Sequence, residues 1–529
     1  MRRWLGPVNE GQGLLFPHDA RSWLPSGHRA WRVLEVAGQL DLSAMERAYR
    51  ADGQGQAPYD PRVMTALLLY CHLKGIRSSR EVAAACVDDV GCRVITGGAM
   101  PSHKAVAEFR RRHRDALKGL FVQVLGLLAA EGALQGGTAS VDGSPASASA
   151  SRAGLTAAQL DARIAAVQAE LDAAAARWAD AAAQGTLGDR DDRGDGDDRD
   201  RGDGDGDGGG AAPGLARLNR LARKLDRLRA ARAALGERAL TAQARDRLDR
   251  AASALARAEA KLAAAEDAQA AKVARYQATL AAGRKWRYGP RVPVPASRNV
   301  KVAALREAVR KARARLAAAR AAAAPGPAAR ISPADPGSRT LPAKDGGGWL
   351  QGYNIQLAAA RRQVLLAIAT HDNPADAGAL LPVITAAIAN LAAAGVPPSL
   401  IRAWLADSGY ASAATFAALA EQKILAVVAI RKDAIQAARQ APARAALHGW
   451  AQVPGDWQKM AARLATPAGK ALYKRRGPQV EPAFAQLFAR FGRYLAYRGH
   501  DAVDAELHLL ATVHNIHKLL AHRARAAPA

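Results

Sequence analysis

Three acidic residues stand out for their local surroundings, although they lie far apart in the chain. Asp142 follows an apolar lead-in and precedes a glycine and a run of very small side chains, "VDGSPASASAS". Asp407, in "LADSGY", also follows an apolar run and is again followed by a small residue and a glycine. Glu481, in "VEPAFAQLF", is expected in the first turn of a helix, where a proline such as Pro482 is tolerated.

The carboxylates of these three residues would support metal chemistry if the fold brought them together. Crowded carboxylates repel one another unless a cation neutralises them, and hard divalent ions such as Mg²⁺ prefer oxygen ligands. Two such ions about 3.5–4 Å apart activate a water or hydroxyl and stabilise the leaving oxygen of a displaced phosphodiester. The small residues beyond Asp142 would leave room for a DNA backbone. Taken singly, an acid followed by glycine after a strand is more typical of an ordinary turn.

The segments around the acids predict an α/β domain made of residues 133–150 and 335–529. Strands are expected in "GYNIQLAAARRQVLLAIAT", with a turn near residues 361–362, and in "SLIRAWLADSGYAS" and "KILAVVAI". Helices are expected in "ADAGALLPVITAAIANLAAAG", "AATFAALAEQ" and "VEPAFAQLFARFGRYLAYRG". Because active groups in an α/β sheet gather where strands end, we expect Asp142 and Asp407 each to end a strand and to converge with Glu481.

Two other pairs of residues are weaker candidates for the same chemistry. Asp372 and Asp376, in "THDNPAD", would add a further acid near the site, although a helix N-cap at Asp376 or Asn373 is the favoured interpretation. His514 and His517 have the i, i+3 spacing of a metal-binding pair, but ordinary core or surface histidines are favoured.

The short helices and tight turns of residues 1–132 are typical of a helical, helix-turn-helix-like DNA-binding domain. One helix is expected to open after Ser78 or Ser79. The stretch "MPSHKAVAEFRRRHRDALKGLFVQVLGLLAAEG" is expected to form a single long helix between Ser102 and Gly132. A row of arginines on this long helix is expected to contact DNA phosphates. An ordinary solvated helix face is an equally favoured interpretation of the same row. The row consists of Arg110, Arg111, Arg112 and Arg114.

Residues 151–334 differ in composition and predict a coiled-coil insertion. Apolar residues recur there at heptad-like spacing in four stretches, which is typical of the arms of antiparallel helical hairpins. Between the first two arms, residues 188–212 are rich in glycine, aspartate and arginine. We expect this loop to be disordered because such a composition buries too little apolar surface.

The composition favours a polyanionic partner. The chain has 529 residues and a formal net charge of +27, and the surplus is spread over all three segments. A surplus of this size favours nucleic acid ahead of an anionic membrane. The 3 cysteines have no CxxC spacing and are expected to be core thiols. Because no apolar run is long enough for a membrane span and no signal peptide is recognised, we expect a cytoplasmic, nucleoid-associated protein.

Four stretches together resemble a bacterial insertion-sequence transposase of the DDE, RNase H-like class, in the subgroup with a helical N-terminal domain and a long insertion after the first catalytic strand. The resemblance covers both ends of the chain but not the coiled-coil and acidic stretch. The four stretches are "YDPRVMTALLLYCHLKGIRSSREVAAACVDDVGCRVITGGAMPSHKAVAEFRRRH", "VDGSPASASASR", "DPGSRTLPAKDGGGWLQGYNIQLA", and "LADSGY" together with "ALYKRRGPQVEPAFAQLFARFGRYLAYRG", ending near "HNIHKLL".

The resemblance implies an RNase H-like fold, a reaction and a set of site residues. Such an enzyme binds the inverted-repeat ends of a mobile element, nicks the DNA with Mg²⁺, for which Mn²⁺ substitutes, and joins the freed 3′-hydroxyls to target DNA. Asp142, Asp407 and Glu481 fall on the three catalytic, metal-binding acids of the family. Tyr473 and Arg476 fall on residues that contact substrate phosphates. Synapsis of two ends of double-stranded DNA implies a homodimer or a larger assembly.

Departures from the family pattern leave other interpretations open. Phe488 stands where the family usually has a lysine, and Arg490 lies nearby but is expected to point elsewhere. Pro145 and Ser149 replace a lysine and an asparagine of the first motif. A catalytically decayed, basic DNA-binding relic is therefore one alternative. An RNase H-like nuclease without strand transfer is another.

Overall fold

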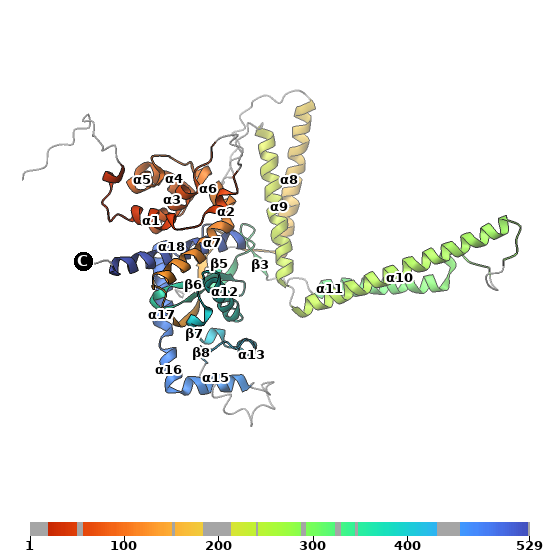
Figure 1. Cartoon of the computed structure of the whole chain (residues 1–529). Helices are drawn as coiled ribbons and strands as arrows, with labels where there is room; N and C mark the ends of the chain where they lie inside the picture. Colours follow the sequence, from red (N-terminus) through yellow and green to blue (C-terminus); the bar gives the residue numbers. More distant parts are fainter. Residues whose placement is uncertain are drawn as a thin grey trace, which may run out of the picture. The chain divides into compact units, whose positions relative to one another are not determined.

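The structure is a computed structural model that describes residues 20–49, 57–150, 154–183, 213–239, 242–286, 292–322, 329–343, 348–430 and 455–526. The chain divides into two compact units, which Figure 1 colours along the sequence. Residues 1–152 and 337–529 form the first unit, and residues 153–336 form the second. In the described part of the chain, no helix is both long enough and apolar enough to cross a membrane.

A six-stranded mixed sheet lies at the centre of the first unit. Strand β1 is antiparallel to β5 on one side and parallel to β7 on the other, and β8 continues the sheet in parallel with β7. Strands β4 and β6 pair with successive parts of β5. The strands are β1 (Gly137–Ser147), β4 (Arg339–Pro342), β5 (Trp349–Ala359), β6 (Leu365–His371), β7 (Ile401–Ala406) and β8 (Ala426–Val428). The strands expected in the C-terminal segment are confirmed, and so is the turn between β5 and β6.

The end of β1 differs from the expectation. Asp142 was expected to end its strand, but it lies in the middle of β1, which runs on to Ser147. The strand continues because residues 143–147 pair with residues 352–356 of β5. The small side chains that follow Asp142 are therefore part of the sheet.

Helices cover the sheet and link it to the N-terminal part of the unit. Helix α12 packs on β6 and β5, α17 packs on β1 and β5, and α18 packs on β6 and on α7 of the N-terminal segment. The C-terminal helices are α12 (Leu380–Ala393), α13 (Ala413–Glu421), α15 (Gly455–Ala465), α16 (Pro467–Tyr473), α17 (Arg476–Phe491) and α18 (His500–Ala526).

Helix α17 begins earlier than the sequence predicted. It starts at Arg476, so Glu481 lies in its second turn and Pro482 lies inside it. A proline inside a helix cannot donate to the carbonyl four residues back, which is that of Pro478. The structure supplies another donor, because Gln363 Nε2 lies 3.1 Å from that carbonyl oxygen. The expectation that Pro482 lies in the first turn was therefore wrong. The sequence pattern could not show that an interior proline is tolerated here, because the donor that replaces its N–H belongs to a distant segment.

The N-terminal segment is helical, as expected, but its long helix is interrupted. Helices α6 and α7 meet at His113, which leaves helical geometry with φ −104° and ψ 23°. The His113 ring bonds the Tyr49 hydroxyl at 2.9 Å. Ser78 and Ser102 cap helices α4 and α6 as expected. The helices are α1 (Arg29–Gly38), α2 (Ser43–Glu46), α3 (Pro61–Leu73), α4 (Ser79–Asp88), α5 (Val90–Thr96), α6 (His103–Arg112) and α7 (Arg114–Ala130).

The cysteines belong to the core of this segment. Cys71, Cys86 and Cys92 are all free and buried, which confirms the interpretation as core thiols.

The second unit consists of two pairs of long helices and a two-stranded ribbon. Ion pairs show that both helix pairs are antiparallel, because the partner's number falls as the first residue's number rises. The pairs are Asp161 with Arg232 and Glu170 with Arg217 in the first, and Glu259 with Arg313 and Glu266 with Arg306 in the second. The helical hairpins expected from the apolar spacing are thus present, while the loop at 188–212 lies outside the described residues. The elements are β2 (Leu155–Thr156), α8 (Ala157–Ala183), α9 (Pro213–Ala239), α10 (Ala242–Ala281), α11 (Val300–Ala322) and β3 (Arg330–Ile331).

Candidate active site

The parallel pairing of β1 with β7 brings Asp142 level with Asp407. Ser140 is paired with Leu405 in this ladder, and both acids lie two residues further along. Side chains that are two residues apart in a strand point to the same face of a sheet. The side chain of Asp142 is 14% exposed and that of Asp407 is 35% exposed, so both carboxylates reach solvent at this face.

The guanidinium of Arg476 lies between the three acids that the sequence singled out. Its Nη2 is 3.1 Å from Asp142 Oδ2 and 3.4 Å from Asp407 Oδ2. Its Nη1 is 3.8 Å from Glu481 Oε1. A cation shared in this way relieves the repulsion between the carboxylates. The structure therefore gathers Asp142, Asp407 and Glu481 around one side chain that is only 12% exposed.

Helix α17 is fastened to β1 by Gln479, a residue that the sequence analysis missed. Gln479 Nε2 donates to Thr138 Oγ1 at 2.8 Å, and its Oε1 accepts from Ser140 Oγ at 2.6 Å. These bonds hold the helix that carries Arg476 and Glu481 against the strand that carries Asp142. The available signal was a glutamine two residues before Glu481, within a segment whose neighbours are apolar.

A fourth carboxylate lies between the segments that follow Asp142 and Asp407. A Cβ added at Gly143 would come within 2.2 Å of Asp376 Oδ1, and one added at Gly409 would come within 3.3 Å of Asp376 Oδ2. Asp376 is thus a neighbour of both acids. The space beside Gly143 is filled by this side chain, whereas the sequence suggested room for DNA. The N-cap interpretation of Asp376 is wrong, because α12 begins at Leu380 with Ala379 as its N-cap.

Amide side chains hold the carboxylate of Asp376 in place. Its Oδ1 accepts from Gln356 Nε2 at 2.6 Å and from Asn354 Nδ2 at 3.1 Å. Gln356 Oε1 in turn accepts from the hydroxyl of Tyr410. Burial raises the pKa of the Tyr410 phenol, and the negative charges of Asp376, Asp142 and Asp407 raise it further. The phenol therefore remains a proton donor, and it ties the turn after Asp407 to β5.

Tyr473 lies within the electrostatic reach of the same acids. It is the last residue of α16, which precedes α17 directly. Burial is the main cause that raises the pKa of its phenol, and Arg476 opposes this effect. The charges of Asp407, Asp142 and Glu481 add to the rise. Tyr473 and Arg476, which the sequence grouped with the acids, are thus both near them.

Phe488 carries a cation on its face. The guanidinium carbon of Arg493 lies 4.4 Å from the centroid of the Phe488 ring, and Phe484 stacks on this ring with a centroid distance of 5.5 Å. Arg493 Nη1 donates to Ser144 Oγ at 3.1 Å. A positive charge thus lies near Phe488 and contacts the residue two positions after Asp142.

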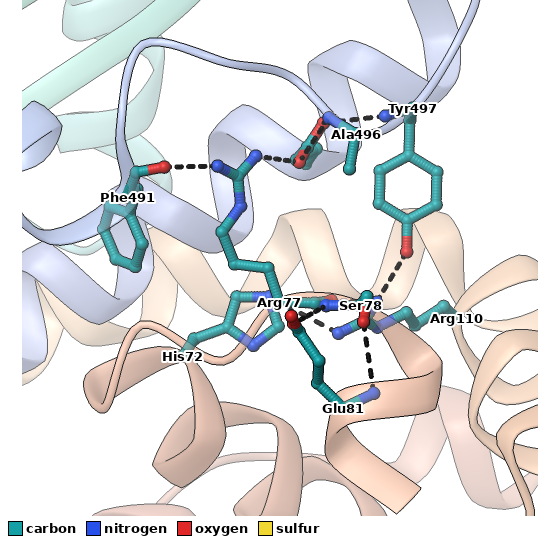
Figure 2. A network of polar contacts seen from close by, with 9 residues as sticks. His72, Arg77, Ser78, Glu81, Arg110, Phe491, Ala496 and Tyr497 are labelled. Atoms are coloured by element: carbon teal, nitrogen blue, oxygen red, sulfur yellow. Dashed lines mark hydrogen bonds and ion pairs between the residues drawn. The ribbon is translucent and has the colours of Figure 1, made fainter. Parts of the chain in front are cut away.

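The four arginines of the N-terminal row do not share one environment. Arg110 is only 8% exposed, and its Nη1 donates to the carbonyl oxygen of Arg77 and to the hydroxyl of Tyr497, both at 2.7 Å. Arg77 itself donates to the carbonyl of Phe491 and pairs with Glu506. Figure 2 shows this network between the N-terminal helices and the segment after α17. The hydrogen bonds of Arg110 therefore connect the N-terminal helices to the segment that follows α17.

The other members of the row remain at the surface to different degrees. The side chain of Arg111 is 71% exposed and that of Arg112 is 45% exposed, and both are paired with Glu108. Arg114 opens α7 and is half-buried. The phosphate-contact expectation therefore rests on Arg111, Arg112 and Arg114.

The acids offer the kind of ligands that a divalent metal ion prefers. Their donor atoms are carboxylate oxygens, which suit Mg²⁺ and Mn²⁺. Within the ranges that the structure describes, no group of three or more acidic, histidine or cysteine side chains has the arrangement of a formed metal site. In this arrangement the guanidinium of Arg476 offsets part of the negative charge of the acids.

Comparisons with known proteins give two family matches. Residues 18–112 match a transposase domain, DUF772, and residues 440–520 match a transposase DDE domain. The first match covers α1 to α6, and the second contains Tyr473, Arg476 and Glu481, while Asp142 and Asp407 lie outside both. A transposase DDE domain implies an RNase H-like fold, with which the mixed sheet agrees. No curated protein and no solved structure matches the chain.

Proposed function

We propose that the chain is an insertion-sequence transposase of the DDE class, which its two transposase-domain matches support, and that it cuts the ends of its element by Mg²⁺-dependent hydrolysis and joins the freed 3′-hydroxyls to target DNA. The observation that carries this proposal is the convergence of Asp142, Asp407 and Glu481 on Arg476, at distances of 3.1, 3.4 and 3.8 Å. Acids from a strand, from the turn after a second strand and from a helix meet at one solvent-facing site, which structural packing alone does not require.

In this proposal Asp142, Asp407 and Glu481 hold the divalent ions, with Mn²⁺ as a substitute for Mg²⁺. When bound, such ions activate a water or hydroxyl and stabilise the leaving oxygen of the phosphodiester. Once divalent ions balance the charge of the acids, Arg476 is released from them. Its planar guanidinium then contacts a substrate phosphate, whose oxygens it matches in geometry. Tyr473, whose raised pKa keeps its phenol protonated, donates to the same phosphate region.

Recognition of double-stranded DNA falls to other parts of the chain. We assign the inverted-repeat ends to residues 1–132, where the exposed Arg111 and Arg112 and the half-buried Arg114 are available to phosphates. Residues 133–150 and 335–529 form the catalytic part, and residues 151–334 form a coiled-coil insertion. Synapsis of two ends requires two active sites, so the working assembly is a homodimer or larger.

Two alternatives make different demands on the site. A decayed DNA-binding relic is favoured by Phe488 in place of a family lysine, but Arg493 supplies a guanidinium on that ring. A nuclease without strand transfer would use the same acids and leave the DNA unjoined.

The decisive experiment replaces each acid and follows the DNA. Asp142→Ala, Asp407→Ala and Glu481→Ala are each expected to reduce Mg²⁺-dependent nicking of labelled element ends to background, because a two-ion site that lacks one ligand misplaces an ion. Binding to the same DNA should survive, because removing acids from a basic protein lessens its repulsion of phosphate. Asp372→Ala is the matched control, since this 70% exposed carboxylate pairs with Arg339 and lies outside the cluster.

The outcomes separate the three functions. Nicking that persists in any of the three acid variants would refute the assignment of that acid. A wild-type chain that binds the ends but never nicks them, with Mg²⁺ or with Mn²⁺, would establish the relic. Nicked ends that are never joined to target DNA would establish the nuclease.

A further inference from the structure

A cavity of about 260 Å³ in the first unit is lined by positive charge. Arg29 and Arg32 of α1 line it, together with Arg490 near the end of α17 and His517 of α18. The other lining residues are Gly27, Leu73, Leu520 and Ala521. No acidic side chain is among these lining residues, so the cavity concentrates charge of one sign.

The charges of this cavity have no acidic partners among the described residues. No described carboxylate forms an ion pair with Arg29, Arg32 or Arg490, and the nearby Glu35 pairs instead with Arg523 at 3.1 Å. Burial lowers the pKa of Arg490, and the charge of Arg29 lowers it further. Burial also lowers the pKa of His517, with Arg490 as the next cause. The half-buried Arg490 thus lies close to the exposed Arg29, and the repulsion between these two like charges is relieved when an anion binds.

The cavity is separate from the acids. Arg490 lies nine residues after Glu481, which is two and a half turns of a helix with 3.6 residues per turn. The two side chains therefore leave opposite faces of α17. Arg490 points away from the acids, as the sequence analysis expected, and reaches α1. The cavity thus combines a helix from the matched transposase domain with two helices from the matched DDE domain.

We propose that this cavity binds a phosphate group of the DNA backbone, at a point away from the bond that is cut. The inference rests on the proposed function, because it assumes that the chain holds element DNA. Arginine forks match phosphate oxygens, and three of them converge here. A bound phosphate would join the recognition helices to α17 and so couple end recognition to the helix that carries Glu481.

The size and lining of the cavity favour a phosphate within DNA over a free nucleotide. Pockets for whole small molecules occupy roughly 300–1,000 Å³, and this cavity is smaller. No phenylalanine, tyrosine or tryptophan is among its lining residues, so the lining lacks the large aromatic side chains that typically hold a stacked base. A single phosphate supplied by a longer backbone fits these limits.

The test compares the salt dependence of DNA binding in the full chain and in Arg29→Ala/Arg32→Ala. Binding of labelled element-end DNA is measured by fluorescence anisotropy without divalent ions, so the result is independent of cleavage. Loss of one phosphate contact should reduce the slope of log K against log salt by about 1. Arg402→Ala/Lys423→Ala removes the same charge elsewhere in the unit and should leave the slope within error of wild type. Arg29→Lys/Arg32→Lys should recover most of the slope.

Thermal denaturation with inorganic phosphate, and separately with ATP, provides the second arm. Phosphate should raise the Tm of the wild type and not that of Arg29→Ala/Arg32→Ala, because only the intact cavity binds it. A Tm of the variant close to that of the wild type without ligand shows that it is folded. Equal slopes for the variant and the wild type would overturn the proposal. Stabilisation by ATP with an unchanged DNA slope would also overturn it and would identify a nucleotide site.

Discussion

Arg476 Nη2 lies 3.1 Å from Asp142 Oδ2, so helix α17 places a cation directly against the acid of the central strand. The same guanidinium reaches Asp407 and Glu481, so three carboxylates share one positive charge. A divalent ion that binds these acids has to take over the charge that Arg476 now neutralises. The arginine is therefore both a stabilising partner and a competitor of the metal.

Arg476→Ala should bind Mg²⁺ or Mn²⁺ more tightly than the wild type, because the metal ion no longer has to displace the guanidinium from the acids. Losing one charge-assisted contact of this kind should raise the affinity by about tenfold. The variant should also be less stable than the wild type without metal, because its acids repel one another. Isothermal titration calorimetry with Mn²⁺ and thermal denaturation with and without Mg²⁺ check these expectations. Arg476→Lys is the control, since it keeps the charge. Equal Mn²⁺ affinity in wild type and Arg476→Ala would contradict the competition.

Gly143→Ala should destabilise the protein by about 1–3 kcal/mol, the usual cost of overpacking. The new methyl group would lie within 2.2 Å of Asp376 Oδ1 and 2.4 Å of Gln356 Nε2, so the amide network beside Asp142 has to shift. Gly119→Ala, within helix α7, is the matched control, because nothing lies within 4 Å of its added Cβ. The control should be neutral or slightly stabilising. Urea denaturation compares the two, and a Gly143→Ala protein as stable as wild type would disprove the tight packing.

Gln363→Ala should lower the free energy of unfolding by about 0.5–1.5 kcal/mol, the usual net contribution of one hydrogen bond, because it removes the donor to the carbonyl of Pro478. Pro482→Ala restores a backbone N–H that is able to bond this carbonyl within the helix. The cost of Gln363→Ala should therefore be smaller in the Pro482→Ala background. A double-mutant cycle by chemical denaturation measures the difference. Additive effects of the two substitutions would mean that Gln363 does not act through this carbonyl.

Acidification should destabilise the protein partly through His514, a buried residue of α18 whose Nε2 lies 2.8 Å from the carbonyl oxygen of Gln363. Burial lowers the pKa of His514 to about 3. Between that pH and about 6.5 the unfolded chain therefore binds a proton that the folded chain does not. The free energy of unfolding should fall as the pH falls through this window, by up to about 1.4 kcal/mol per pH unit for this residue.

His514→Gln should flatten the dependence of stability on pH between 6.5 and 5, while the exposed His103→Gln should leave it unchanged. Denaturation curves at several pH values give the slopes. Burial also lowers the pKa of His72 well below its usual value, so part of the wild-type slope should remain in His514→Gln. Identical slopes for His514→Gln and wild type would exclude His514 as a source of the effect.

The sequence determined the elements of the fold wherever a local pattern carried the information. Apolar periodicity located β5, β6, β7 and β8 and most of the helices, and serines marked the starts of α4 and α6. The resemblance to DDE transposases selected Asp142, Asp407 and Glu481 before any geometry was known. The family matches support that class, and the structure brings the three acids together.

Only the tertiary structure decided how these residues are held. The extension of β1 beyond Asp142 depends on its pairing with β5, and the proline inside α17 is accommodated by Gln363 from another segment. Arg110 resembles its neighbours in sequence, yet it is buried against Tyr497. Asp376 became a neighbour of the acids because glycines left space for it. Each outcome depends on contacts between residues that are distant in the chain. A local pattern carries no information about which distant group will bond a carbonyl, pair with a charge or fill the space beside a glycine.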